Sequence, residues 1–236
     1  MSYQDNFYKN KESNFYFRRF KKNENIYKKL RPSKEEILLQ LNKNLNIYDK
    51  KVLEIGCFVG DLLWRLKNNF RCKVDGIEPS SLACKFAKDK FLIKIENTTF
   101  AKSKKFMINS NNLSRYDIII IDDVLSWVDR NLILQTISSI DWLLKPNGYI
   151  FIRDFSPSNS FAVINRHWKK EKIYNFKQAN GHKSYFLQSG KYIIVESKIY
   201  ITTKFNKIKT KNEESNIWND VILKEINNFT FPIIKL

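Results

Sequence analysis

The chain has 236 residues and a formal net charge of +18, with 43% hydrophobic and 14% aromatic residues. This composition is ample for a packed core, which argues against a disordered chain, and no apolar run approaches the roughly 20 residues of a membrane helix. The start of the chain lacks the apolar core of a signal peptide, and three cysteines without a close pair argue against a disulfide framework and a zinc site. We therefore expect a soluble, cytoplasmic protein with no bound metal and no membrane contact.

The excess of positive charge has two explanations. Lysine, asparagine and isoleucine are abundant, as an AT-rich genome would produce, and the lysines are scattered rather than arranged in a stripe. A polyanion such as RNA would also account for the charge, because summed positive charge attracts phosphate backbones. We favour the compositional explanation and keep nucleic acid as the weaker alternative.

Residues 1–46 form an N-terminal extension and a helix. Residues 1–31 mix basic residues with Tyr and Phe and could contact RNA, but we favour an extension whose aromatic rings pack over the domain. Apolar residues at helical spacing predict a helix over 34–46. Ser33 is expected to cap this helix, with Glu36 bonding back to the cap.

From residue 47 onward, short apolar strands alternate with helices. The predicted strands are 51–56, 73–78, 92–96, 116–122 and 149–154, and the predicted helices are 61–69, 80–90 and 132–144, with a turn at 146–148. The isoleucine run at 118–121 indicates a strand that is buried on both faces. This alternation predicts an α/β fold, a Rossmann-like, doubly wound and mostly parallel sheet with helices on both faces.

The pattern changes after residue 154. A helix is predicted over 160–168, a long strand over 191–204 and a closing helix over 217–228. We therefore assign residues 47–156 to the core and 157–236 to a β-rich accessory segment that completes the sheet, within one compact domain.

Acidic residues gather where the predicted parallel strands end, which is where an open sheet of this kind binds its ligands. They are Glu54, Glu78, Asp122, Asp123 and Asp154. Glu78 follows Gly56 by 22 residues, the position from which a carboxylate accepts the hydroxyl hydrogens of an adenosine ribose. Gly56 and Gly60 would permit a sharp turn and a close approach of the backbone to a ligand.

The charges at these strand ends help to select the ligand. Glu54 and Asp122 would repel a pyrophosphate but would attract an ammonium or sulfonium group. Phe58 stands where the dinucleotide fingerprint G-x-G-x-x-G has its second glycine, and Asp61 adds negative charge where phosphate would lie. Both features argue against NAD.

Four motifs in order resemble the class I S-adenosylmethionine-dependent methyltransferases over about residues 50–154. VLEIGCFVG is similar to the first motif through Glu54, Gly56 and Gly60, although Phe58 replaces its middle glycine. GIEPS resembles the second motif, YDIIIIDDVLSWVD the fourth-strand motif, and LLKPNGYIFI the loop and strand that follow it. Any one motif would be a weak signal, but four in the right order and spacing are a fairly strong one.

The resemblance implies an enzyme that uses S-adenosyl-L-methionine as its methyl donor. In that family pattern, Glu78 would bind the ribose hydroxyls, and the backbone at Gly56 and Cys57 would face the cofactor. Asp122 would approach the methionine end, and Asn97 would lie near the adenine.

The acceptor is less readable than the cofactor. Methyl transfer is an in-line displacement that requires an aligned acceptor and, for some oxygen or amine acceptors, a general base. His167 and His182 are candidate bases, although an exposed loop histidine is the commoner explanation of each. Further candidates for lining the acceptor pocket are Asp123, Trp127, Asp154 and Tyr185.

The absence of an N/D-P-P-Y-type motif after the fourth predicted strand lowers the odds of adenine or glutamine N-methylation. We expect a small-molecule or sugar-type acceptor. An RNA methyltransferase, and a non-catalytic regulatory protein that binds S-adenosylmethionine, remain the alternatives.

Overall fold

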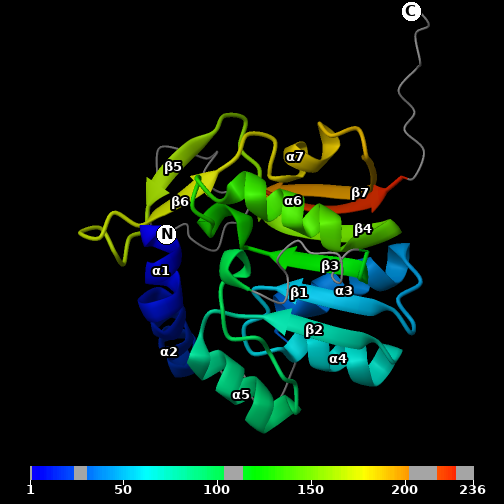
Figure 1. The fold of residues 1–236 in the computed structure, drawn as a ribbon, viewed down its shortest axis with the longest axis horizontal. Coiled ribbons are helices and arrows are strands. Elements are labelled where there is room, and N and C mark those ends of the chain that lie inside the picture. Colours follow the sequence, from blue (N-terminus) through cyan, green and yellow to red (C-terminus); the bar gives the residue numbers. More distant parts are fainter. Residues whose placement is uncertain (1, 24–30, 104–113, 202–216, 227–236) are drawn as a thin grey trace, which may run out of the picture.

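The computed structural model describes residues 2–23, 31–103, 114–201 and 217–226, and its centre is a six-stranded sheet in the order β2-β1-β3-β4-β8-β7 (Figure 1). The parallel strands are β1 (Lys51–Ile55), β2 (Lys73–Ile77), β3 (Tyr116–Asp122) and β4 (Leu144–Phe155). The antiparallel strands are β7 (Tyr192–Ile201) and β8 (Ile217–Glu225). This mostly parallel, Rossmann-like sheet confirms the predicted fold class.

Helices cover both faces of the sheet. α3 (Pro32–Asn44) and α4 (Asp61–Phe70) pack on one face, and α6 (Ile133–Leu143) and α7 (Lys183–Leu187) pack on the other. α5 (Ser81–Phe91) packs against α4 beside the β2 edge. Within the described ranges, no helix combines the length and the apolar character needed to cross a bilayer.

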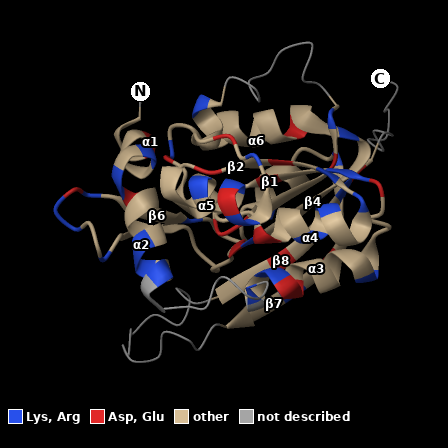
Figure 2. Cartoon of the chain, turned by 90° about the horizontal axis from the view of Figure 1, so that it is seen from below, with Lys and Arg blue, Asp and Glu red and all other residues tan. Residues whose placement is uncertain are grey.

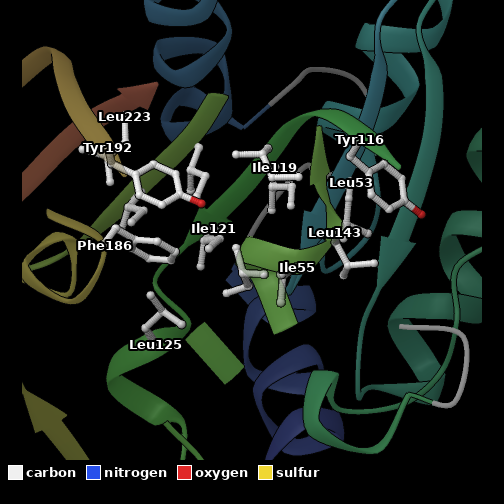
Figure 3. Packing of buried hydrophobic residues seen from close by; sticks show 14 of the residues in the cluster. Leu53, Ile55, Tyr116, Ile119, Ile121, Leu125, Leu143, Phe186, Tyr192 and Leu223 are labelled. Atoms are coloured by element: carbon white, nitrogen blue, oxygen red, sulfur yellow. The ribbon is translucent and has the colours of Figure 1, made fainter. Parts of the chain in front are cut away.

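The larger core cluster lies between the sheet and α6 and α7 (Figure 3). The isoleucines of β3 alternate between the two faces, so Ile119 and Ile121 enter this cluster while Ile118 and Ile120 enter the cluster beneath α3. At one end the rings of Phe186 and Tyr192 meet edge to face, with centroids 5.3 Å apart. The predicted burial of this strand on both faces is thereby confirmed.

The N-terminal extension is helical and continuous. It consists of α1 (Tyr3–Phe7), the π-helical segment η1 (Tyr8–Glu12) and α2 (Ser13–Asn23). Figure 1 shows α1 and α2 standing across the ends of the parallel strands, next to the small separate sheet of β5 (Phe161–Ile164) and β6 (Tyr174–Lys177). Two short 3-10 segments complete the fold, η2 (Phe100–Lys102) and η3 (Leu125–Trp127).

Two predicted helices are strands. Residues 217–228 were expected to form a helix, but 217–225 form β8, which lies between β4 and β7 and is buried on both faces. A short run of buried apolar residues fits a helix or an inner strand equally well, and here pairing with β4 decides. In the same way, β5 occupies part of the helix expected over 160–168, because its four residues pair with β6.

Three smaller expectations also need correction. α3 begins at Pro32 with Arg31 as its N-cap, since proline suits the first helical position, so Ser33 lies inside the first turn and does not cap. The strand expected over 92–96 reduces to one bridge between Ile77 and Glu96. Residues 146–148 lie inside β4 rather than in a separate turn, although Asn147 has a positive φ of 62°.

Candidate active site

The carboxyl ends of the four parallel strands meet at one edge of the sheet, and the N-terminal extension covers this edge. Gln4 bonds to both the N–H and the carbonyl of Tyr174, and its amide also donates to the Trp127 carbonyl at 2.9 Å. On the other side, Lys9 donates to the carbonyls of Asn97 and Pro79. The extension therefore spans from the β2 end to β6.

Lys34 is buried between the acids that end β1 and β3. Its Nζ lies 2.6 Å from Glu54 Oε1 and 2.8 Å from Asp122 Oδ2, and the Lys34 side chain is only 2% exposed. Burial lowers the pKa of Lys34, but the charges of Asp122 and Glu54 outweigh burial and raise it above its usual value. Glu54 Oε2 is buried and has no hydrogen-bond partner among the described residues.

The two acids respond differently to this ammonium group. Burial raises the pKa of Glu54 despite the opposing charge of Lys34. Burial also acts to raise the pKa of Asp122, but the charges of Lys34 and Arg153 prevail and lower it. The sequence placed both acids at this edge correctly, yet it did not reveal the cation between them.

A signal for Lys34 existed in the sequence. Lys34, Ile37 and Leu41 follow the i, i+3, i+7 spacing of one helix face, and Ile37 and Leu41 are fully buried. The apolar stripe of α3 therefore points Lys34 inward as well. A lysine on a buried stripe requires a carboxylate partner, since an unpaired buried charge is costly.

Glu78 ends β2 with both of its carboxylate oxygens engaged. Oε2 accepts the Phe58 N–H at 3.0 Å and Oε1 accepts the Ser80 N–H at 2.8 Å. Burial raises the pKa of Glu78 to about 7, against the effect of these two backbone bonds. Each oxygen accepts one hydrogen in this arrangement and keeps capacity for another.

The backbone conformation and the close packing at position 56 require glycine. Its φ is +73°, and a Cβ at this position would lie 2.4 Å from a methyl carbon of Val124. The N–H groups of Gly56 and Cys57 both donate to the Ile77 carbonyl, at 2.9 Å and 3.1 Å. Gly60 has a φ of +72° where it caps α4. Both glycines thus serve the turn that leads from β1 into α4.

Phe58 anchors the N-terminal extension. Its ring is in contact with those of Tyr16, Phe17 and Phe20, with centroids 5.3, 5.8 and 5.1 Å away, and the Arg31 guanidinium lies 5.0 Å from its centroid. This confirms that the N-terminal aromatic residues pack over the domain.

Asp61 does not act as the free negative charge that the sequence suggested. Arg31 donates to both of its oxygens, at 2.9 Å and 2.8 Å, and the charge of Arg31 lowers the pKa of Asp61 despite burial. The argument against a phosphate ligand therefore rests on Phe58 and on Glu54 and Asp122.

Asp123 and Asp154 lie at the same edge of the sheet, just beyond β3 and within the end of β4. Asp123 has a φ of 56°, and its Oδ1 accepts the indole N–H of Trp127 at 3.0 Å. Partial burial by the surrounding protein and the charges of Asp154 and Asp122 raise its pKa above the usual value, although the residue is exposed enough for water to weaken these effects. Burial lowers the pKa of the nearby Lys177 to about 8.

His182 lies behind Asp154 and is 1% exposed. Its Nδ1 is 3.6 Å from Asp154 Oδ2, and within the described chain neither ring nitrogen has a hydrogen-bond partner. Burial lowers the pKa of His182. His182, Asp154 and Gly181 line a small pocket together with Ile152, Phe155, Lys183, Asn219 and Val221.

The remaining candidates lie at the margins. His167 is exposed in the turn after β5, where its ring faces Phe15. Asn97 is exposed, and its amide donates to the carbonyls of Glu78 and Pro79. The Tyr185 hydroxyl donates to Gln178 and accepts from Arg130. Across the described ranges, no group of His, Cys, Asp and Glu side chains could hold a metal ion.

Comparison with known proteins agrees with this geometry. A family model described as a methyltransferase domain matches residues 23–190, well over half of the chain. Among curated proteins, no sequence match is found.

Solved structures with the same fold include the Burkholderia thailandensis 1,6-didemethyltoxoflavin-N1-methyltransferase with bound S-adenosylhomocysteine. It has a TM-score of 0.60 and 13% identity, covering 91% of this chain and 84% of that one. A putative S-adenosylmethionine-dependent methyltransferase from Listeria monocytogenes has a TM-score of 0.60 and 14% identity, covering 83% and 99%. The Streptomyces coelicolor geranyl diphosphate C-methyltransferase has a TM-score of 0.58 and 10% identity, covering 81% and 77%.

Proposed function

Since the chain belongs to the class I S-adenosylmethionine-dependent methyltransferases, we propose that it transfers the methyl group to a small-molecule or sugar-type acceptor held beside Asp123. The observation that carries this choice is the cover over the strand ends. The N-terminal extension bridges from Pro79 to Tyr174, and Tyr8 packs against Trp127 with ring centroids 5.9 Å apart. Strand ends covered in this way suit a compact acceptor better than a nucleic-acid strand, which needs an open groove.

The residues present fit the cofactor. Glu54 Oε2 has no hydrogen-bond partner among the described residues and can therefore accept a hydrogen bond from an ammonium group. Each oxygen of Glu78 can accept one further hydrogen bond from a ribose hydroxyl. We propose that Glu54 and Asp122 hold the methionine end, with Gly56, Cys57 and Gly60 shaping the turn against it and Asn97 beside the adenine. The bound cofactor supplies an electrophilic methyl group on a sulfonium.

We assign proton transfer to Asp123. Among the described acids at this edge it is the most exposed to solvent, and its raised pKa suits it to take a proton from a hydroxyl or amine acceptor. His182 is buried, so it acts as a positioning group through Asp154. His167, exposed beyond β5, is the alternative base.

The charge distribution also favours a small acceptor. In Figure 2 the Lys and Arg residues of the described ranges are spread over many separate elements, at both ends and near the centre of the view, and form no single stripe. Two of the structural neighbours are named for small-molecule acceptors, 1,6-didemethyltoxoflavin and geranyl diphosphate. Both features support a small molecule over RNA.

A labelling experiment tests the acceptor class. The protein is incubated with methyl-tritiated S-adenosylmethionine and a cell extract, which is then separated into small-molecule, RNA and protein fractions. We expect the label in the small-molecule fraction. Label in the RNA fraction that ribonuclease releases would show an RNA methyltransferase, and no label anywhere, with S-adenosylhomocysteine still bound, would show a regulatory protein.

The cofactor site has its own test. S-adenosylhomocysteine should raise the Tm of the wild-type protein, and Glu78→Ala should abolish this shift. Asp141→Asn is the matched control, because Asp141 accepts from Lys191 and Tyr192 at the start of β7. Stabilisation by NAD instead of S-adenosylhomocysteine would contradict the cofactor assignment.

A further inference from the structure

Lys34 occupies the space between the two carboxylates to which we assign the methionine end of the cofactor. It uses one oxygen of each, Glu54 Oε1 and Asp122 Oδ2, while Glu54 Oε2 finds no partner in the described part of the chain. The adjacent Arg31 is engaged by Asp61 and forms a separate neutral pair. Two carboxylates and one ammonium therefore leave this cluster with a single net negative charge.

The methyl donor and its product differ by one charge at this end. The donor carries a sulfonium, an ammonium and a carboxylate, which gives one net positive charge. After methyl transfer, the sulfonium has become a neutral thioether, while the ammonium and the carboxylate are unchanged. A buried cluster of fixed charge distinguishes the two forms, because charges interact more strongly in a protein interior than in water.

We propose that Lys34 sets the charge of the cofactor pocket and so determines how strongly the protein distinguishes S-adenosylmethionine from S-adenosylhomocysteine. Removing Lys34 leaves two uncompensated carboxylates and favours the cationic form further. Neutralising Glu54 leaves a neutral cluster and weakens the preference for the cation. This inference rests on the placement of the methionine end between Glu54 and Asp122 proposed above.

Lys34 also stabilises the folded state of this pocket. Two buried carboxylates without a cation would destabilise the fold strongly. Lys34 on α3 neutralises one of the two negative charges, so one negative charge remains to attract the ligand. The same side chain therefore stabilises the edge of the sheet and limits its attraction for cations.

Calorimetric titration with both ligands tests the proposal. The ratio of the two affinities is measured for the wild type, Lys34→Met, Glu54→Gln and the double variant Lys34→Met/Glu54→Gln. We expect the ratio to favour S-adenosylmethionine by about tenfold more in Lys34→Met and about tenfold less in Glu54→Gln, equivalent to about 1.4 kcal/mol per unit of charge. The double variant restores the net charge of the wild type and should restore its ratio.

The double variant keeps the test decisive if Lys34→Met alone fails to fold, since it leaves only Asp122 without its cation. Lys191→Met is the matched control, because it breaks a 2.7 Å ion pair with Asp141 and should leave the ratio unchanged.

Two outcomes would overturn the proposal in different ways. Equal changes in both affinities would mean that Lys34 contacts only groups that the two ligands share, which preserves the placement of the methionine end. Unchanged affinities for both ligands would place the methionine end elsewhere and overturn that placement as well. The loss of the Tm shift in Glu78→Ala is independent of either result.

Discussion

The two halves of the strand-end edge differ in how their charges are compensated. On the cofactor side, Lys34 lies between Glu54 and Asp122, and Glu78 accepts two backbone N–H groups. On the proposed acceptor side, Asp123 has a raised pKa and His182 is buried without a hydrogen-bond partner in the described chain. This difference suggests that the proposed cofactor side has paired charges because it binds the same ligand in every reaction. The proposed acceptor side retains titratable groups without such partners, which lowers the stability of the fold.

The largest effect should come from Asp123→Asn, which removes the proposed proton acceptor and keeps the shape of the side chain. We expect the rate of methyl transfer into the labelled acceptor fraction to fall by about 10²–10⁴-fold, the usual contribution of a general base. The affinity for S-adenosylhomocysteine, measured by calorimetry, should stay unchanged.

Asp129→Asn is the control for this variant, since Asp129 lies in the neighbouring loop and bonds to Ser2 and Asn131. A rate of Asp123→Asn within a few-fold of the wild type would show that the two halves are not divided by function as proposed.

The next largest effect is the pH dependence of stability that Glu78 causes on the proposed cofactor side. Burial raises the pKa of Glu78 to about 7 from its ordinary value of 4.5, so the folded state holds this proton more tightly than the unfolded state does. Its contribution to stability is therefore greatest at low pH and is lost as the pH rises towards 7. From pH 5 to pH 8 the wild type should lose about 2–3 kcal/mol of unfolding free energy relative to Glu78→Gln.

Denaturant unfolding of both proteins, without ligand, at several pH values measures this difference. If the difference in unfolding free energy between the two proteins were constant across this pH range, Glu78 would be ionised throughout. The negative charge of Glu78 would then be compensated by its surroundings even before a ligand binds.

Phe58→Gly tests whether the cofactor side depends on the N-terminal extension. The substitution removes the contacts with Tyr16, Phe17 and Phe20, and it relieves the positive φ of 52°. Loss of a buried phenylalanine, partly offset by the easier backbone, should lower the unfolding free energy by about 2 kcal/mol. Limited proteolysis should then cut within residues 2–23.

Tyr48→Ala is the control for proteolysis, because Tyr48 is an exposed ring that packs on Phe70 instead. Protection of residues 2–23 in Phe58→Gly equal to the wild type would show that the polar bonds of Gln4 and Lys9 hold the extension without Phe58.

The sequence predicts features that depend on local patterns better than features that depend on long-range contacts. The strands up to β4 and the acids at their ends follow from local patterns, because parallel strands of a doubly wound sheet alternate with helices along the chain. β8 escaped this reasoning, since its pairing with β4 joins segments about 70 residues apart, such as Arg153 and Asp220. Lys34 escaped for a similar reason, because Asp122 lies 88 residues further along.

The smallest effect should come from His182→Phe on the acceptor side. Both ring nitrogens of His182 are buried without a hydrogen bond to any described residue, so they lose their water without compensation. A ring of similar shape without polar atoms should raise the unfolding free energy by about 1 kcal/mol. Methyl transfer should slow at the same time, with a shifted pH profile, if His182 positions Asp154. A loss of stability instead would mean that the pocket beside Asp154 and Gly181 holds water that satisfies the imidazole, and the acceptor side would then be as well compensated as the cofactor side.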